Sequence, residues 1–315
     1  MSEQFTKVGD GLLVRAPGKI NLSLLIAGKR EDGYHNIESI MAKIDWFDEI
    51  VIEQKTEDGG QRTEDGIKNI ELICKGVYKV PEGEENLVYK AAKEILKIKN
   101  QKVESSEWKN KRLKITLTKN MPAGSGLGSG SSDAAATLMG INEFLKLGMG
   151  KKELVELAAK LGSDMAFFLD GPIALCTGRG EKVKKLAKCE FGALLIVPNV
   201  SVSTKRVYEN YRHDEAKYKR LREEINVYIE KKRIDLICSM GANMLQESCF
   251  ELHPELGVLK KRIESMGVRP VCLSGSGSSL YCIINNINDK GVKTYRDRIE
   301  QEFGCRSIIL NNNSW

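Results

Sequence analysis

A glycine-rich segment that runs directly into an alanine-rich one constrains this chain more than any other feature. Residues 120–137 read NMPAGSGLGSGSSDAAAT, with glycines at 124, 126, 128 and 130 alternating with small residues. Glycine permits positive φ angles and a close approach of the backbone to a ligand, and small neighbours leave successive N–H groups open to an anion. The run from Ser131 to about Lys146 predicts a helix whose N-terminus would face that anion. The pattern therefore favours a phosphate-binding loop over a flexible Gly/Ser linker.

Two familiar phosphate-binding patterns do not fit this loop. A P-loop would require a lysine after its last glycine, where this chain has serine. The dinucleotide pattern G-x-G-x-x-G fails because serines stand at 129 and 131, where the third glycine would fall. A second small-residue turn occupies residues 274–278 (SGSGS) between two apolar runs, and alone it is equally typical of a hairpin turn. Together, the two segments suggest a chain that closes around one substrate.

The length and composition allow a well-packed protein of two domains. The chain has 315 residues, of which 41% are apolar and 29% are charged, and domains commonly hold roughly 100–200 residues. Strand and helix patterns are mixed without a regular βαβ alternation, which favours an α+β fold over a doubly wound sheet. We expect a domain boundary near 175–195 and divide the chain into 1–185 and 186–315.

Hydrophobic periodicity locates the expected elements. Residues 11–28 predict a strand, a turn at Ala-Pro-Gly-Lys and a second strand, and residues 272–284 predict another strand–turn–strand unit. Further strands are expected at 48–54, 70–74, 113–118, 173–177 and 193–197. Helices are expected after an N-cap at Asn86, over 131–146, over 151–161 with a stop at Gly162, over 215–233 and from Glu255.

Charge and cysteine content favour a cytoplasmic protein with an anionic substrate. Lysine and arginine exceed aspartate and glutamate by six. The eight cysteines show no C-x-x-C spacing and suggest buried thiols in a reducing compartment, while three scattered histidines do not suggest a zinc site. The first residues lack the apolar core of a signal peptide, and no apolar run approaches the ~18–20 residues that cross a bilayer.

Two residues are candidates for the chemistry. Phosphoryl transfer to an alcohol needs neutralised phosphates, usually with Mg²⁺, and a group that accepts or orients the hydroxyl proton. Lys19 follows Ala-Pro-Gly between apolar runs, which is unusual for a solvated surface lysine. Asp164 lies in LGSDMAFFLDG, where a helix N-cap is the alternative interpretation. If the two met, the lysine would favour the ionised carboxylate, which suits orienting the hydroxyl and accepting its proton late.

Aromatic residues suggest a site for a flat ring. Tyr34 and His35 follow a polar turn, and Tyr208 ends the segment SVSTKRVY. A lone histidine is more often structural than functional, and Tyr208 by itself reads as one more half-buried aromatic residue. A tyrosine ring near a substrate site could stack on a nucleobase.

These motifs resemble a known family. APGKINL at 16–22, PAGSGLGSGSSDAAA at 122–136 and LSGSGSS at 273–279 resemble the three signature segments of the GHMP kinases, which phosphorylate small-molecule alcohols with ATP and Mg²⁺. GYH at 33–35, ENLVYKAA at 85–92, LGSDMAFFLDGPIALCTGRGE at 161–181 and SVSTKRVY at 201–208 resemble the branch whose substrate is a polyol linked to cytidine diphosphate. The resemblance covers about residues 13–285. It implies a GHMP kinase fold, with an N-terminal ribosomal-protein-S5-like ATP-binding domain and a C-terminal ferredoxin-like α/β sandwich domain.

The resemblance also implies a role for each matching residue. Lys19 and Asp164 correspond to the catalytic pair, and Asn21 would lie beside them near the polyol. The residues that would cradle the ATP phosphates are Pro122, Ala123, Gly124, Ser125, Gly126, Leu127, Gly128, Ser129, Gly130, Ser131 and Ser132, with Ser131 or Ser132 as the Mg²⁺ contact. Those that would hold the second substrate are Tyr34 and Tyr208 on either face of the cytosine, His35 at its polar edge, and Thr204, Gly275, Ser276 and Gly277 at its diphosphate and sugar.

The chain departs from the family pattern at Gly18, where alanine is more usual, at Ala166, where proline is usual, and over 99–112, which is longer and more basic than expected. The runner-up function is another GHMP kinase, acting on mevalonate, homoserine or a sugar. An alternative of a different class is a non-catalytic nucleic-acid binder that would use Lys109, Lys111, Arg112 and Lys114 around Trp108. We favour the kinase, as a monomer or weak homodimer with no nucleic-acid or membrane partner.

Overall fold

The computed structural model describes residues 4–56, 70–102, 111–284 and 287–315, and it divides the chain into two compact units. The first unit holds residues 1–18, 47–123 and 129–169, and the second holds 19–46, 124–128 and 170–315. The units interleave because two long strands, β2 (Gly11–Lys29) and β3 (His35–Thr56), each give residues to both. A single boundary at 185/186 therefore does not describe these units.

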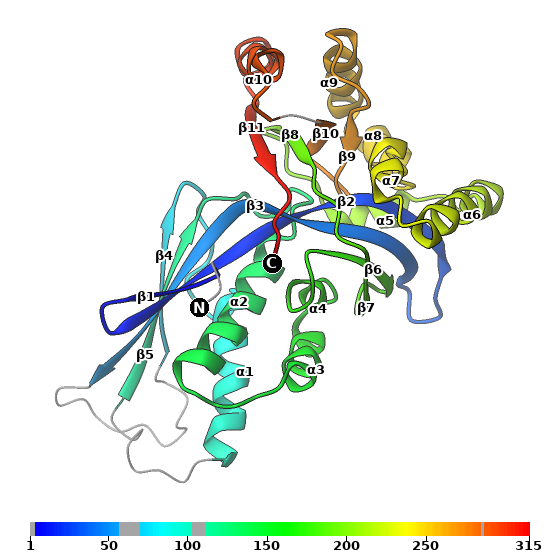
Figure 1. Ribbon diagram of the computed structural model, residues 1–315. Coiled ribbons are helices and arrows are strands. Elements are labelled where there is room, and N and C mark those ends of the chain that lie inside the picture. Colours follow the sequence, from blue (N-terminus) through cyan, green and yellow to red (C-terminus); the bar gives the residue numbers. More distant parts are fainter. Residues whose placement is uncertain (1–3, 57–69, 103–110, 285–286) are drawn as a thin grey trace. The chain divides into compact units, whose positions relative to one another are not determined.

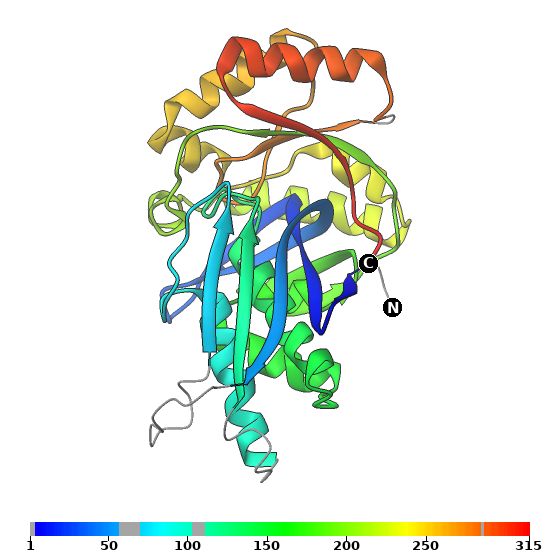
Figure 2. The ribbon, with the colours of Figure 1, turned by 90° about the vertical axis from the view of Figure 1, so that its left-hand side faces the viewer.

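The first unit packs helices on one face of a sheet. β1 (Phe5–Val8) pairs with the start of β2, and β5 (Lys111–Lys119) lies between residues 49–56 of β3, antiparallel, and β4 (Ile70–Gly76), parallel. The helices are α1 (Leu87–Lys102), α2 (Ser129–Phe144), α3 (Lys151–Leu161) and α4 (Met165–Phe168). Figures 1 and 2 show α1, α2 and α3 on one side of β4 and β5. A core of aliphatic residues fills the space between them.

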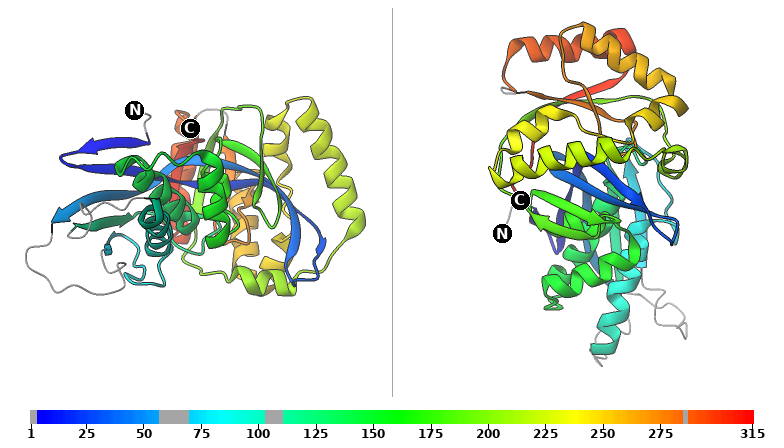
Figure 3. Two further views of the ribbon diagram at one scale, coloured as in Figure 1. Left: turned by 90° about the horizontal axis from the view of Figure 1, so that it is seen from below. Right: turned by 90° about the vertical axis from the view of Figure 1, so that its right-hand side faces the viewer.

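The second unit contains a four-stranded antiparallel sheet in the order β11–β8–β10–β9. Its strands are β8 (Gly192–Val197), β9 (Cys272–Leu273), β10 (Leu280–Ile284) and β11 (Arg306–Asn311). Figures 2 and 3 show α9 (Pro254–Ser265) and α10 (Lys290–Phe303) along one face of this sheet. The remaining helices are α5 (Thr204–Asn210), α6 (Glu215–Glu230), α7 (Ile234–Met240) and α8 (Gln246–Leu252). β6 (Ile173–Gly178) pairs with residues 37–42 of β3 and with β7 (Lys182–Lys185).

Most expected elements are present, and the mixed sheets with segregated helices confirm the α+β prediction. Asn86 caps α1, since its side-chain oxygen accepts a hydrogen bond from the Val88 amide at 2.8 Å. The helix expected from Ser131 begins two residues earlier, at Ser129. All eight cysteines are free thiols, six of them buried. No helix within the described ranges is long and apolar enough to cross a membrane.

The turn expected at Ala-Pro-Gly-Lys is wrong, because residues 11–29 form one continuous strand. Residues 16–20 are all buried, so the extended chain keeps this run inside the protein. A proline fits a strand where its missing N–H is not needed for pairing. In the basic stretch, Trp108 and Lys109 lie outside the described residues.

Candidate functional site

The part of the glycine-rich loop that belongs to the second unit is held by two side chains. Lys19 Nζ donates a hydrogen bond to the Gly126 carbonyl at 2.8 Å, and Ser274 Oγ donates to the same oxygen at 2.9 Å. The Lys19 amide also donates to the Leu127 carbonyl at 2.9 Å. Gly126 has φ of +80°, and a Cβ there would overlap the Ser274 carbonyl oxygen. Glycine is therefore required at this position, because the loop backbone touches the 274–278 turn directly.

Lys19 and Asn21 form a buried polar pair on β2. Lys19 is 4% exposed and Asn21 is 3% exposed. Lys19 Nζ donates to Asn21 Oδ1 at 2.6 Å, and Asn21 Nδ2 donates to Ser39 Oγ at 2.8 Å. The two residues share one face of the strand because side chains two positions apart point the same way. The ammonium is thus held in one place beside the loop backbone, as a group that must neutralise charge at a defined point would be.

The 274–278 turn is tied to the same cluster. The Asn21 amide donates to Ser274 Oγ at 3.4 Å, and Thr204 Oγ1 lies 2.8 Å from Ser276 Oγ. Asn243, which belongs to no sequence motif, donates from Nδ2 to the Gly275 carbonyl at 2.8 Å and to the Leu273 carbonyl at 2.9 Å. No pattern around Asn243 suggests this role, since it lies outside every signature segment.

Within the second unit, the structure therefore brings together several residues that the sequence indicated. They are Lys19, Asn21, Gly126, Thr204, Gly275 and Ser276.

The aromatic candidates divide into two groups. The His35 ring lies 5.4 Å from the Tyr208 ring and meets Tyr211 edge-on at 5.9 Å. Tyr34 is 58% exposed, and the Arg179 guanidinium lies 5.2 Å from the centre of its ring. Burial lowers the pKa of the His35 imidazole, with further lowering by Lys29 and His213. His35 is therefore neutral at neutral pH and able to accept or donate a hydrogen bond according to its tautomer.

The loop residues of the first unit lie at the start of α2. Ser129 Oγ donates to the Pro122 carbonyl at 3.2 Å, and the backbone N–H groups in the first turn of α2 have no carbonyl partner within the helix. Ser131 is half-buried, and Ser132 Oγ is buried with no hydrogen-bond partner among the described residues. Hydroxyl oxygens at a helix N-terminus fit the hard-oxygen ligands that Mg²⁺ takes together with phosphate. The described residues contain no group of three or more His, Cys, Asp or Glu that could hold a metal ion.

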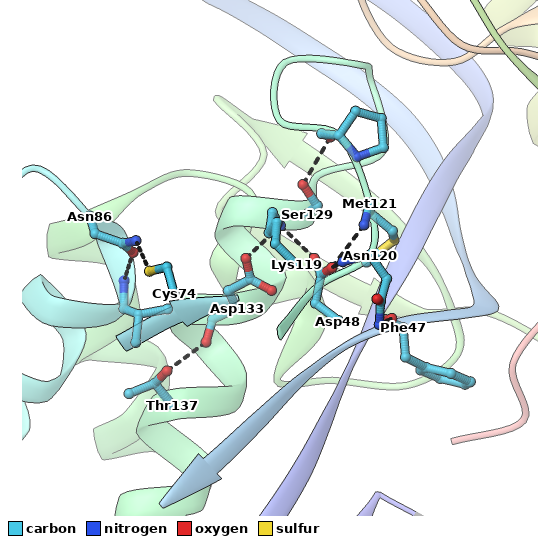
Figure 4. Close-up of polar contacts among 12 residues, drawn as sticks. Phe47, Asp48, Cys74, Asn86, Lys119, Asn120, Met121, Ser129, Asp133 and Thr137 are labelled. Atoms are coloured by element: carbon cyan, nitrogen blue, oxygen red, sulfur yellow. Dashed lines mark hydrogen bonds and ion pairs between the residues drawn. The ribbon is translucent and has the colours of Figure 1, made fainter. Parts of the chain in front are cut away.

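The first unit also contains a buried ionic cluster that no sequence motif indicated (Figure 4). Lys119 Nζ donates to Asp133 Oδ2 at 2.7 Å and to Asp48 Oδ2, and all three residues are at most 2% exposed. Lys119 precedes the loop and Asp133 follows it. A Lys and an Asp 14 residues apart carry no recognisable spacing, so only the folded chain reveals their contact.

Asp164 occupies the N-cap position of α4, in the first unit. Its side chain makes no capping hydrogen bond to that helix, whose described residues are Met165–Phe168. The helix-cap alternative therefore does not account for the carboxylate. Lys19 lies in the second unit, so the expected pairing of Lys19 and Asp164 stays a prediction.

Comparison with known proteins matches both halves of the chain to family descriptions. The GHMP kinases N terminal domain matches residues 86–172, and the GHMP kinases C terminal domain matches residues 225–296. A protein from Bacillus cytotoxicus named 4-diphosphocytidyl-2-C-methyl-D-erythritol kinase is 37% identical over 276 residues, covering 87% of this chain and 89% of that protein. A protein of the same name from Bacillus cereus is 36% identical over the same shares.

Two solved kinase structures are also similar to this chain. A crystal structure of 4-(cytidine 5'-diphospho)-2C-methyl-D-erythritol kinase is 27% identical and has a TM-score of 0.70, covering 96% of this chain and all of that one. A homoserine kinase from Cytophaga hutchinsonii, 18% identical with a TM-score of 0.70, covers 98% of this chain and 96% of its own and shares the fold.

Proposed function

The chain belongs to the 4-diphosphocytidyl-2-C-methyl-D-erythritol kinases of the GHMP kinase superfamily, and we propose that it transfers the γ-phosphoryl group of ATP to the 2-hydroxyl of 4-diphosphocytidyl-2-C-methyl-D-erythritol. The new bond joins the hydroxyl oxygen to phosphorus, and ADP leaves. The observation that carries this proposal is the identity of 37% over nearly the whole of both chains. The product would serve the non-mevalonate route to isoprenoid precursors.

In this proposal, the glycine-rich loop binds ATP through its backbone. Residues 122–132 offer N–H groups from a segment with little side-chain bulk, followed by the positive end of α2. Ser131 or Ser132 would hold Mg²⁺, which when bound shields the phosphate charges. Lys19 adds a fixed positive charge next to the loop carbonyl of Gly126. These features supply positioning and charge neutralisation, which account for most of phosphoryl-transfer catalysis.

Lys19 and Asp164 are the proposed catalytic residues. Asp164 would orient the substrate hydroxyl and accept its proton as the bond to phosphorus forms, and Lys19 would stabilise the charge that develops on the transferred group. Asn21 fixes Lys19 through a bond of 2.6 Å and would contact the methylerythritol hydroxyls. If the two residues act as one unit, Lys19→Met and Asp164→Asn together should slow turnover no more than either alone. Fully additive losses would separate their roles.

The cytidine end of the substrate would lie among the aromatic residues. Tyr34 and Tyr208 would stack on the cytosine ring, and His35, which lies against Tyr208, would bond to its polar edge. Thr204 and residues 275–277 would position the diphosphate and sugar, because Thr204 and Ser276 already share a hydrogen bond. Tyr211 joins this group as a contact of His35.

A coupled ADP-release assay tests the substrate directly. We expect turnover with 4-diphosphocytidyl-2-C-methyl-D-erythritol and none above background with mevalonate, homoserine or galactose at equal concentration. Turnover of one of the other alcohols alone would overturn the assignment in favour of that kinase. RNA binding with steep salt dependence and no ATP turnover would instead favour the nucleic-acid alternative.

Two further parts of the proposal concern the cellular location and the oligomeric state of the protein. Eight free thiols are typical of a reducing compartment, which supports a cytoplasmic location. We also propose a monomer or weak homodimer, which light scattering across a concentration series would test.

A further inference from the structure

The buried cluster of Lys119, Asp48 and Asp133, named here the loop clamp, joins three elements of the first unit. Lys119 is the last residue of β5, Asp48 lies on β3 and Asp133 lies near the start of α2. One ammonium bonds to two carboxylates, and the Lys119–Asp133 bond is 2.7 Å long. The clamp therefore links the residue before the glycine-rich loop to a residue just after it (Figure 4).

The clamp also holds the backbone where the loop begins. Asp48 Oδ1 accepts hydrogen bonds from the amides of Asn120 at 2.6 Å and Met121 at 2.9 Å. The backbone carbonyl of Lys119 in turn accepts a hydrogen bond from the Val77 amide at 2.9 Å. Both oxygens of Asp48 are thus used, one for Lys119 and one for the entry to the loop.

The electrostatics show that this arrangement is costly to bury. Burial opposes the charge of Lys119, but Asp133 and Asp48 outweigh that effect and raise the pKa of its ammonium. Burial raises the pKa of the Asp133 carboxyl well above its ordinary range, against the lowering effect of Lys119. Apolar residues of similar volume often stabilise a core as well as or better than a buried ion pair. The position of the clamp at both ends of one loop therefore suggests a role in geometry.

We propose that Lys119, Asp48 and Asp133 are positioning residues that hold the two ends of the glycine-rich loop in the ATP-binding conformation before ATP arrives. The inference rests on the proposed function of this loop in binding ATP. A loop that is already ordered loses less conformational freedom on binding, so its affinity is higher. None of the three residues needs to touch the nucleotide for this effect.

The test removes one tether and measures nucleotide affinity. Asp133→Ala deletes the carboxyl within an alanine-rich helix, where alanine is the best helix former. We expect the Kd for the non-hydrolysable analogue AMP-PNP with Mg²⁺ to rise about tenfold, as for a loop that is correctly ordered in roughly a tenth of the molecules. The kcat at saturating ATP and the KM for the cytidine substrate should change less than about twofold by the same reasoning. Asp133→Asn keeps an oxygen acceptor for Lys119 and should restore most of the affinity.

A matched control lies on the same two strands. Lys114 of β5 forms an ion pair with Glu53 of β3 at 3.0 Å, away from the loop. Lys114→Met should leave the Kd for AMP-PNP unchanged. An unchanged Kd in Asp133→Ala, or an equal rise in the Lys114 variant, would refute the positioning role.

If Asp133→Ala does not fold, amide hydrogen exchange in the wild-type protein tests the positioning role instead. The amides of Asn120 and Met121 should exchange hydrogen slowly without nucleotide and should not slow further with AMP-PNP. Protection that appears only with AMP-PNP would overturn the proposal. Because AMP-PNP binding does not involve the second substrate, failure of the cytidine substrate assay would leave this result intact and would count against the substrate assignment alone.

Discussion

Replacing Gly126 by alanine should damage the protein far more than the same change at Gly124. Both glycines have positive φ, +80° at Gly126 and +67° at Gly124. A Cβ at Gly126 would overlap the Ser274 carbonyl oxygen and lie 3.1 Å from that of Gly277. A Cβ at Gly124 would meet nothing closer than the Val202 carbonyl oxygen at 3.9 Å. The pair of variants therefore separates backbone strain from steric overlap.

The magnitude follows from what each variant loses. A left-handed alanine costs about 1–2 kcal/mol at either position. At position 126 the overlap forces the loop backbone away, which breaks the bonds of its carbonyl to Lys19 and Ser274. A bond to a charged donor contributes about 1.5–3 kcal/mol and a neutral one about 0.5–1.5 kcal/mol. We expect Gly126→Ala to lower the free energy of unfolding by about 3–6 kcal/mol in total.

Urea unfolding followed by circular dichroism measures both variants against the wild type. The kinase assay adds a second readout, since displacing the loop should raise the KM for ATP in Gly126→Ala more than in Gly124→Ala. Equal destabilisation by the two variants would show that the loop does not press against the 274–278 turn. That result would refute the account of why glycine is required at position 126.

Three further predictions concern the reaction. Asp164→Asn should lower kcat by at least about 100-fold, typical of a lost proton acceptor, while AMP-PNP still binds; near-normal turnover would remove Asp164 from the mechanism. Tyr208→Ala should raise the KM for the cytidine substrate more than the KM for ATP, and equal shifts would argue against stacking. Burial lowers the pKa of His35, so the folded protein favours the neutral imidazole. The free energy of unfolding should therefore be unaffected by this group above pH ~6.5 and should fall as the pH drops below that value. The KM for the cytidine substrate should rise over the same acidic range in the wild type and less so in His35→Gln; parallel pH profiles would exclude His35.

The sequence predicted well wherever local rules decide the structure. The N-cap at Asn86, the stop of α3 at Gly162 and the hairpin between β9 and β10 all follow from residues within a few positions of each other. The continuous β2 strand was not predicted, because Pro-Gly is locally typical of a turn. In the folded chain, residues 16–20 are instead extended and buried against segments distant in the sequence. Most other boundaries moved by one to three residues, but the strand expected at 48–54 is the end of β3, which already begins at His35.

In the site, too, some features follow from local sequence and others only from contacts between distant residues. The signature segments alone indicated a GHMP kinase and most of the residues that meet around Lys19, because backbone shape and charge in short motifs can be recognised from the sequence. Asn243, Tyr211 and the loop clamp could not be found in this way, since their contacts join positions that no fixed spacing relates. Amino-acid type and order determined which chemistry this protein carries. Only the tertiary structure decided which buried charges hold its loop in place, because ionic and steric contacts depend on distances that folding alone creates.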